Sequence, residues 1–135
     1  MEKDTENTQG SAEIQAVLKK MRLAYVANLP QQLASISALV MELKKSEDYQ
    51  ISYENLYRAI HSLKGTAGTY DLPIISAICL PFDEYLTASL EGGSDAGDQQ
   101  ISRCLYFIDL LCRASSLAAE GRESFPEIEA SLAAM

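Results

Sequence analysis

Apolar side chains recur every three to four residues along most of this 135-residue chain. That spacing places them on one face of an α-helix. Five stretches share the pattern, each bounded by polar residues, glycine or proline: residues 11–25, 30–45, 53–68, 75–91 and 101–120. None of them alternates apolar and polar residues as a β-strand does. We therefore predict an all-α protein, an antiparallel four-helix bundle with an additional N-terminal helix.

Pro30 separates the first two helical stretches. A proline is well tolerated in the first turn of a helix, but inside a continuous helix it costs about 3 kcal/mol unless packing compensates. The pattern leaves open whether residues 11–45 form two helices or one kinked helix. The first stretch is predicted to bury one apolar face, made of Ile14, Val17, Leu18, Met21 and Tyr25.

The two ends of the chain differ from the predicted bundle, which spans residues 11–121. Residues 1–10 show no apolar periodicity and are expected to form a disordered leader. Residues 122–135 form a tail or a short helix, with Pro126 in its first turn and Ile128 and Leu132 on one side.

Composition narrows the classes of partner. The net charge is -8, and the few basic residues are scattered, which argues against nucleic-acid binding. No apolar run approaches the roughly 20 residues of a membrane span, and the N-terminus lacks the basic and apolar segments of a signal peptide. We expect a cytoplasmic protein with protein partners. Cys79, Cys104 and Cys112 form no Cys-x-x-Cys pair and are expected to be buried, reduced thiols.

The helix predicted from Tyr53 contains the only histidine of the chain, His61. Ser52 is a suitable N-cap, because a serine side chain can accept a hydrogen bond from a free amide at a helix start. At 100° per residue, His61 projects about 130° from the centre of the apolar side. We therefore expect His61 to face solvent. The residues on the apolar side are Leu56, Ile60, Leu63 and Ala67.

Lys64, Gly65 and Gly68 return to the same face as His61. A glycine within a helix costs about 0.5–1 kcal/mol relative to alanine, so two of them suggest that another molecule comes close to this face. An imidazole is largely neutral near pH 7 and can act as a nucleophile without a general base. A lysine one turn away can stabilise an anion on the imidazole. These are the requirements of phosphoryl transfer, which depends mainly on positioning and electrostatic help.

Each feature also has a simpler explanation when taken alone. A single histidine on a helix is usually structural or incidental, and glycines can allow helix packing or mark fraying near a helix end. Lys64 and Arg58 can belong to an ordinary solvated face. The glycines weaken these explanations because they lie beside a histidine that is predicted to be exposed.

The segment His61–Gly68 reads His-Ser-Leu-Lys-Gly-Thr-Ala-Gly. It resembles the His-x-Leu-Lys-Gly-small-Ala signature of histidine-containing phosphotransfer (HPt) domains. The similarity extends from about Leu23 to Leu90, and residues 25–30 are similar to the first bundle segment of the family. The resemblance implies a phosphorelay carrier. His61 would accept a phosphoryl group from a receiver-domain aspartate of a hybrid histidine kinase and pass it to the receiver aspartate of a response regulator.

The resemblance also implies roles for the neighbours of His61. Lys64 would steady the phosphoryl oxygens, and Gly65 and Gly68 would let the receiver come close. Tyr57 and Arg58 lie within about 60° of His61 on the helical projection, and we expect them in the docking surface as well. The magnesium that the family relies on sits on the receiver, so this chain is expected to hold no metal or other cofactor. Neither kinase nor hydrolase activity is expected of it, and the pattern requires no more than a monomer.

Two positions depart from the family pattern. Many members have glycine ten residues after the histidine, where this chain has Asp71. Pro81 is unusual within the next helix, where it removes a hydrogen bond to the carbonyl of Ala77, so we expect a kink or a restart of that helix. These departures concern the connection after the His61 helix and the helix that follows it, rather than His61 itself.

Two other functions compete with the carrier. The first is a helical adaptor that binds receiver or kinase domains without transfer. The second is a hydrolase with His61 as general base, which needs an orienting acid and a nucleophile at the imidazole. Glu54 is the only acid on the same helix face, two turns away, so the sequence gives this function little support.

Overall fold

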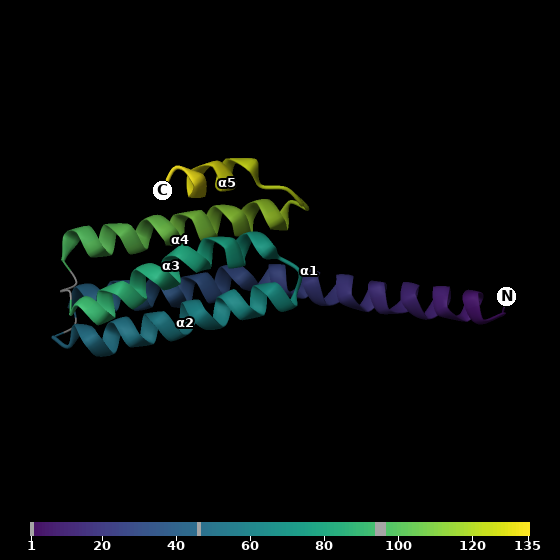
Figure 1. Cartoon of the computed structure of the whole chain (residues 1–135), viewed down its shortest axis with the longest axis horizontal. Coiled ribbons are helices and arrows are strands. Elements are labelled where there is room, and N and C mark those ends of the chain that lie inside the picture. Colours follow the sequence, from purple (N-terminus) through teal and green to yellow (C-terminus); the bar gives the residue numbers. More distant parts are fainter. Residues whose placement is uncertain (1, 46, 94–96) are drawn as a thin grey trace.

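The computed structural model describes residues 2–45, 47–93 and 97–135, with side chains from residue 10 onward. Regular structure within these ranges is entirely helical. Figure 1 shows the helices α1 to α4 side by side, with α1 extending beyond the others and α5 next to the C-terminal part of α4. The predicted all-α helical bundle is confirmed. The helices are α1 (Glu2–Lys45), α2 (Tyr49–Thr69), α3 (Pro73–Gly92), α4 (Asp98–Ala119) and α5 (Pro126–Ala133).

The apolar sides of the four long helices meet in one core. α1 packs against α2 and α4, and α3 packs against the same two helices, so the four close into a ring. Phe82 of α3 stacks on Phe107 of α4 with ring centroids 4.8 Å apart, which joins the second half of the bundle. Other large side chains that are completely or almost completely buried are Leu29, Leu33, Leu43, Tyr53, Leu56, Ile60, Ile75, Ile78 and Leu86.

α1 runs through Pro30 as a single helix of 44 residues. The question left open by the sequence is therefore answered, and the prediction of a separate, additional N-terminal helix is wrong. Proline removes the hydrogen bond to the carbonyl of Val26. The flanking Leu29 and Leu33 are 0% and 2% exposed, so core packing on both sides of Pro30 compensates for the missing bond.

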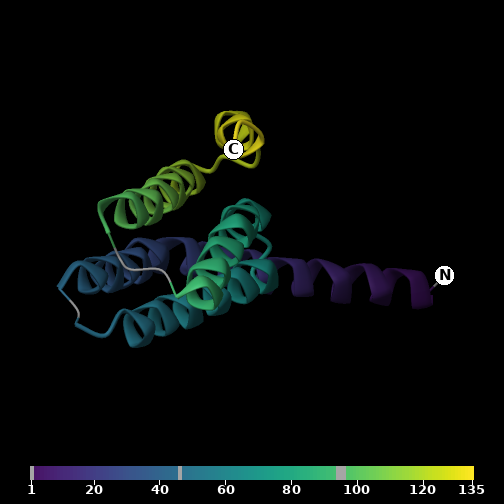
Figure 2. The ribbon, with the colours of Figure 1, turned by 60° about the vertical axis from the view of Figure 1, so that its left-hand side comes forward.

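The N-terminal part of α1 lies outside the bundle (Figures 1 and 2). Residues 2–10 are its first turns, in contrast to the predicted disordered leader, while residue 1 lies outside the described residues. Adding residues to an existing helix is much easier than nucleating one, so a polar segment can remain helical without an apolar face. Further along, Tyr25 is buried as predicted. The other predicted face residues are exposed: Ile14, Val17, Leu18 and Met21.

α2 begins at Tyr49, four residues earlier than predicted. The side chain of Asp48, rather than Ser52, caps it by accepting a hydrogen bond from the amide of Ile51 at 3.3 Å. Ser52 is buried inside the helix. Aspartate and serine are about equally good N-caps, so local sequence could not decide between the two starts. Residues 49 and 50, which precede the predicted start of this helix, are therefore helical.

Asp71 occupies the connection between α2 and α3 in a left-handed conformation, with φ of 57°. Glycine adopts this conformation without strain, and aspartate tolerates it better than most residues, which explains why Asp71 can replace the glycine common in the resembled family. The Nε of Arg22 donates a hydrogen bond to the carbonyl of Asp71 at 2.9 Å. Pro73 then starts α3, which continues through Pro81 as one helix, so of the two predicted alternatives, a kink or a restart, the restart does not occur.

The C-terminal segment forms the short helix α5, as one of the two alternatives predicted, and Pro126 lies in its first turn. Ile128 is completely buried, so this helix belongs to the packed fold. Cys79 and Cys104 are buried, but Cys112 is exposed, so the prediction of three buried thiols is wrong for Cys112. Among the described residues, no helix is both long and apolar enough to cross a membrane.

Candidate functional site

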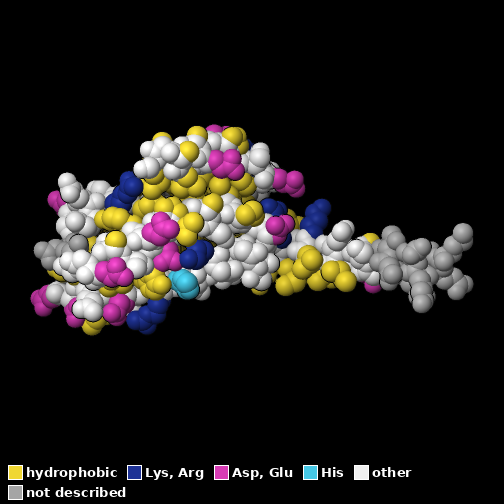
Figure 3. Space-filling model, viewed as in Figure 1, with side chains coloured by type: hydrophobic (Ala, Val, Ile, Leu, Met, Phe, Trp, Pro, Cys, Tyr) yellow, Lys and Arg dark blue, Asp and Glu magenta, His cyan; other side chains and the backbone are white. Residues whose placement is uncertain are grey.

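His61 lies on the outer side of α2, and its side chain is 60% exposed. The residues predicted for the apolar side of this helix are all buried, which turns His61 outward as the sequence indicated. Figure 3 shows the single histidine at the surface, next to basic and acidic side chains. The ring of Tyr57, one turn earlier, stacks on the imidazole with centroids 5.7 Å apart.

Asp83 of α3 supplies a carboxylate beside the histidine. Its Oδ2 lies 3.3 Å from Nδ1 of His61 and 2.6 Å from Nζ of Lys64. The hydroxyl of Thr87 donates to the carbonyl of Asp83 at 2.9 Å and lies 3.5 Å from its Oδ1. One carboxylate oxygen therefore joins the two α2 side chains that were predicted to act together.

Asp83 was not predicted, because the helical period identifies only the neighbours of His61 on its own helix. A signal was present: Asp83 lies one helical turn after Cys79, which is predicted to be buried, and a carboxylate on a core face is rarely buried unless it is paired. Asp83 is only 8% exposed, so it does need such partners. Which cations would pair with it depends on how α2 and α3 align.

The electrostatics favour a charged Asp83–Lys64 pair. Burial alone would raise the pKa of Asp83, but the hydrogen bonds from Lys64 and His61 outweigh it, and the pKa of Asp83 is lowered. The hydrogen bond to Asp83 raises the pKa of Lys64. Both groups therefore remain ionised throughout the neutral range.

The position of Asp83 selects the histidine tautomer. A carboxylate accepts hydrogen bonds, so Nδ1 of His61 must carry the proton, and we assign the tautomer on this chemistry. Nε2 then keeps its lone pair free. An exposed imidazole with a free Nε2, held by a carboxylate on one side and a tyrosine ring on another, can act as a nucleophile toward a group brought in from solvent.

The family comparison agrees with this chemistry. The Hpt domain family matches residues 20–134, which is most of the chain. The chain therefore belongs to the Hpt domain family. Hpt domains are helical bundles that act as phosphocarrier modules in phosphorelays rather than as catalysts. Searches of the curated proteins and of the solved structures gave no match.

The extent of the family match differs from the predicted similarity over residues 23–90. It includes all of α4 and α5, and it leaves out residues 1–19. The protruding part of α1 is thus mostly outside the Hpt region. The bundle that carries His61 lies inside it.

The glycines of the Hpt signature lie on exposed positions after His61. A Cβ added to Gly65 would meet no atom within 4 Å, so the fold itself does not require glycine there. A Cβ on Gly68 would lie 3.8 Å from Oγ of Ser76, an ordinary contact. Close packing of the helices therefore explains neither glycine.

The remaining predicted docking residue, Arg58, is exposed and forms an ion pair with Glu54 at 3.8 Å rather than with a group of the His61 site. Leu80 was not predicted. It lies on α3 one turn before Asp83, on the same helix face, and is 51% exposed. The surface around His61 thus includes one exposed leucine that the sequence did not indicate.

Proposed function

We propose that this Hpt domain carries phosphate between two receiver domains, with His61 as the phosphoacceptor. The observation that carries the proposal is the contact between Nδ1 of His61 and the carboxylate of Asp83, on a side chain that is otherwise exposed. It leaves Nε2 free to attack phosphorus. In the first step Nε2 forms a bond to the phosphorus of an aspartyl phosphate, while the P–O bond breaks and its electron pair stays on the aspartate.

Asp83 helps this step electrostatically. As Nε2 attacks, the imidazole ring gains positive charge, and a carboxylate at Nδ1 stabilises that charge. In the second step the aspartate of another receiver attacks the phosphohistidine, the N–P bond breaks, and the ring returns to its neutral form. The two steps are the same exchange between an aspartate oxygen and Nε2 run in opposite directions, so the carrier can work both ways.

Lys64 has a different role in the proposal. Its ammonium group has three hydrogen atoms to donate, and the contact with Asp83 uses one of them. The others can reach the oxygens of a phosphoryl group on the neighbouring imidazole, one turn away. The ion pair with Asp83 keeps the lysine charge near this position before the phosphoryl group arrives.

The receiver is proposed to dock over the exposed sides of α2 and α3. Gly65 and Gly68 leave room for its backbone, and Tyr57 and Leu80 offer apolar contacts beside His61. Arg58 stays at the edge of this surface, bound to Glu54. The magnesium ion needed for aspartyl phosphate chemistry is proposed to sit on the receiver.

Incubation with a phosphorylated receiver tests the proposal. The expected product is a phosphoprotein that is stable in alkali and labile in acid, as phosphohistidine is, and that His61→Gln abolishes. Label retained by His61→Gln would overturn it. Receiver binding with no phosphate on the wild-type chain would instead support the adaptor. Transfer measured against a panel of receiver domains would then identify the donor and the recipient.

A further inference from the structure

Four apolar side chains of α1 lie outside the bundle, and we call them the overhang stripe: Ile14, Val17, Leu18 and Met21. Their exposed fractions range from 44% to 62%. Single exposed apolar residues are common, but four at helical spacing on one face indicate a surface that binds another chain. Figure 3 shows hydrophobic side chains along the protruding part of α1.

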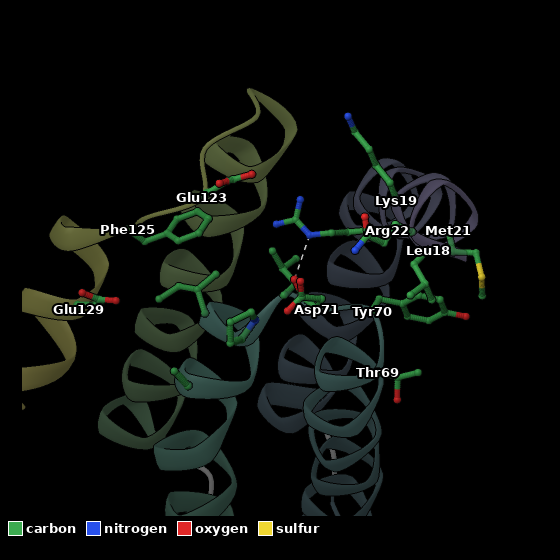
Figure 4. A pocket seen from close by; sticks show the side chains of 15 residues that line it. Leu18, Lys19, Met21, Arg22, Thr69, Tyr70, Asp71, Glu123, Phe125 and Glu129 are labelled. Atoms are coloured by element: carbon green, nitrogen blue, oxygen red, sulfur yellow. Dashed lines mark hydrogen bonds between the residues drawn. The ribbon is translucent and has the colours of Figure 1, made fainter. Parts of the chain in front are cut away.

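The bundle cannot cover this stripe. α2 ends at Thr69, and the ring of Tyr70 stacks on Tyr25 with centroids 4.8 Å apart, so α2 stops where the overhang begins. Leu18 and Met21 line an open hollow of about 990 Å³ at this end of the bundle. Figure 4 shows both near Tyr70. Most of the stripe also precedes residue 20, where the Hpt match begins.

The charges next to the stripe indicate which chain covers it. Glu13 and Lys20 are both exposed. At 100° per residue they lie about 90° and 110° from the centre of the stripe, on the same side. When two helices pair antiparallel about a two-fold axis, each edge of one helix faces the same edge of the other. Glu13 of each copy then faces the edge that carries Lys20 of the other.

The register agrees with this charge pattern. The four apolar side chains overlap fully when Ile14 lies opposite Met21 of the second copy and Val17 lies opposite Leu18. In that register the levels of Glu13 and of Lys20 of the second copy differ by two residues. Two residues rise by about 3 Å along the helix axis. Long side chains can bridge this offset. A parallel pair would instead turn the edge that carries Glu13 and Lys20 toward the opposite edge of the second copy, where Gln15 and Arg22 lie, so Glu13 would face no lysine.

We propose that the chain forms an antiparallel homodimer through the overhang stripe of α1. A crossing angle of about 50°, common for packed helices, carries the N-terminal turns of each copy past the end of α2 of the other. The contact is one short helix pair, and interfaces well below about 1,200 Å² are typical of weak complexes. The dimer should therefore form only at high protein concentration.

Sedimentation equilibrium of the full chain, from about 1 µM to about 500 µM, measures this association. The expected result is a monomer at the low end and a dimer at the high end, consistent with a weak interface. Leu18→Glu should stay monomeric throughout. The control is Leu105→Glu on α4, where the leucine is also exposed, at 39%, but lies far from the stripe in the fold. Circular dichroism checks that each variant remains helical.

A charge exchange tests the orientation. Glu13→Lys and Lys20→Glu should each weaken the dimer several-fold, because each places like charges together at both ends of the stripe. The double variant, which has the original net charge, should restore it. A parallel dimer would behave differently, because Glu13 and Lys20 of the two copies do not face each other in it, so the double variant would not restore the association that a single change removes.

Several results would overturn the proposal: a monomer at every concentration, an equal loss of association in Leu105→Glu, or a double variant no better than the single ones. If Leu18→Glu sediments like the wild type but binds the receiver more weakly, the stripe belongs to receiver docking instead. Phosphorylation of His61 should be unchanged in Leu18→Glu, so failure of this proposal is distinct from failure of the carrier function.

Discussion

Replacing Asp83 by asparagine removes one negative charge beside His61 and changes the side-chain shape very little. The asparagine oxygen can still accept a hydrogen bond from Nδ1. What is lost is the attraction between the carboxylate and the positive charge that develops on the imidazole. The distance from Oδ2 to Nδ1 is 3.3 Å, and the imidazole is 60% exposed. In a water-like dielectric this attraction is about 1.3 kcal/mol, so transfer should slow by about tenfold.

The assay follows label from a phosphorylated receiver to the Hpt domain, in single-turnover conditions at saturating receiver. Glu84→Gln is a matched control, because it removes one negative charge from the next residue of α3, where the side chain is exposed. It should transfer at nearly the wild-type rate. Receiver affinity should change little in Asp83→Asn, because Asp83 is 8% exposed and can make few contacts with a docked partner.

Two outcomes would refute this reasoning. If Asp83→Asn transfers as fast as the wild type, the carboxylate does not assist the imidazole. If Asp83→Asn and Glu84→Gln slow transfer equally, the effect comes from net charge and not from the contact with His61. The pH dependence adds a further check. Because the pKa of Asp83 is lowered, Asp83 stays charged between about pH 6 and pH 8. The ratio of the transfer rate of Asp83→Asn to that of the wild type should therefore stay constant over this range.

Three further predictions concern stability and docking. Gly65→Ala should raise the free energy of unfolding in urea by about 0.5–1 kcal/mol, because alanine favours the helix, yet slow transfer by hindering the receiver; a variant with unchanged transfer would contradict the docking role. Asp71→Gly should raise the midpoint of urea unfolding, since it removes about 1 kcal/mol of left-handed strain, whereas Asp71→Val should lower it; the reverse order would contradict the strain argument. The folded pKa of Asp83 lies below its ordinary value of 3.8. Its contribution to stability is therefore present above about pH 4 and is lost as the pH falls through the folded pKa. The stability difference between wild type and Asp83→Asn, from unfolding curves at several pH values, should shrink below about pH 4, and a constant difference would be inconsistent with the ion pair.

Several elements of the fold could not be predicted from local sequence. Asp48 and Ser52 are both good helix caps, and the choice between them depended on burial of Ser52 in the bundle. Pro30 favours a break on local grounds, but packing of Leu29 and Leu33 keeps α1 continuous. At Pro30 a local preference of about 3 kcal/mol was outweighed by tertiary packing, whereas the two caps are about equal locally and packing decided between them.

The sequence by itself determined that the chain is helical and which side of α2 faces the core. Both follow from the 3.6-residue period, which any single helix displays along its own residues. It therefore also determined that His61 faces outward with Lys64 and the two glycines. The tertiary structure decided what surrounds this face. Asp83 reaches His61 only because α2 and α3 align as they do, and the overhang stripe is exposed only because α2 ends beside Tyr25. Such relations join residues of different helices, and no periodicity within one helix records them.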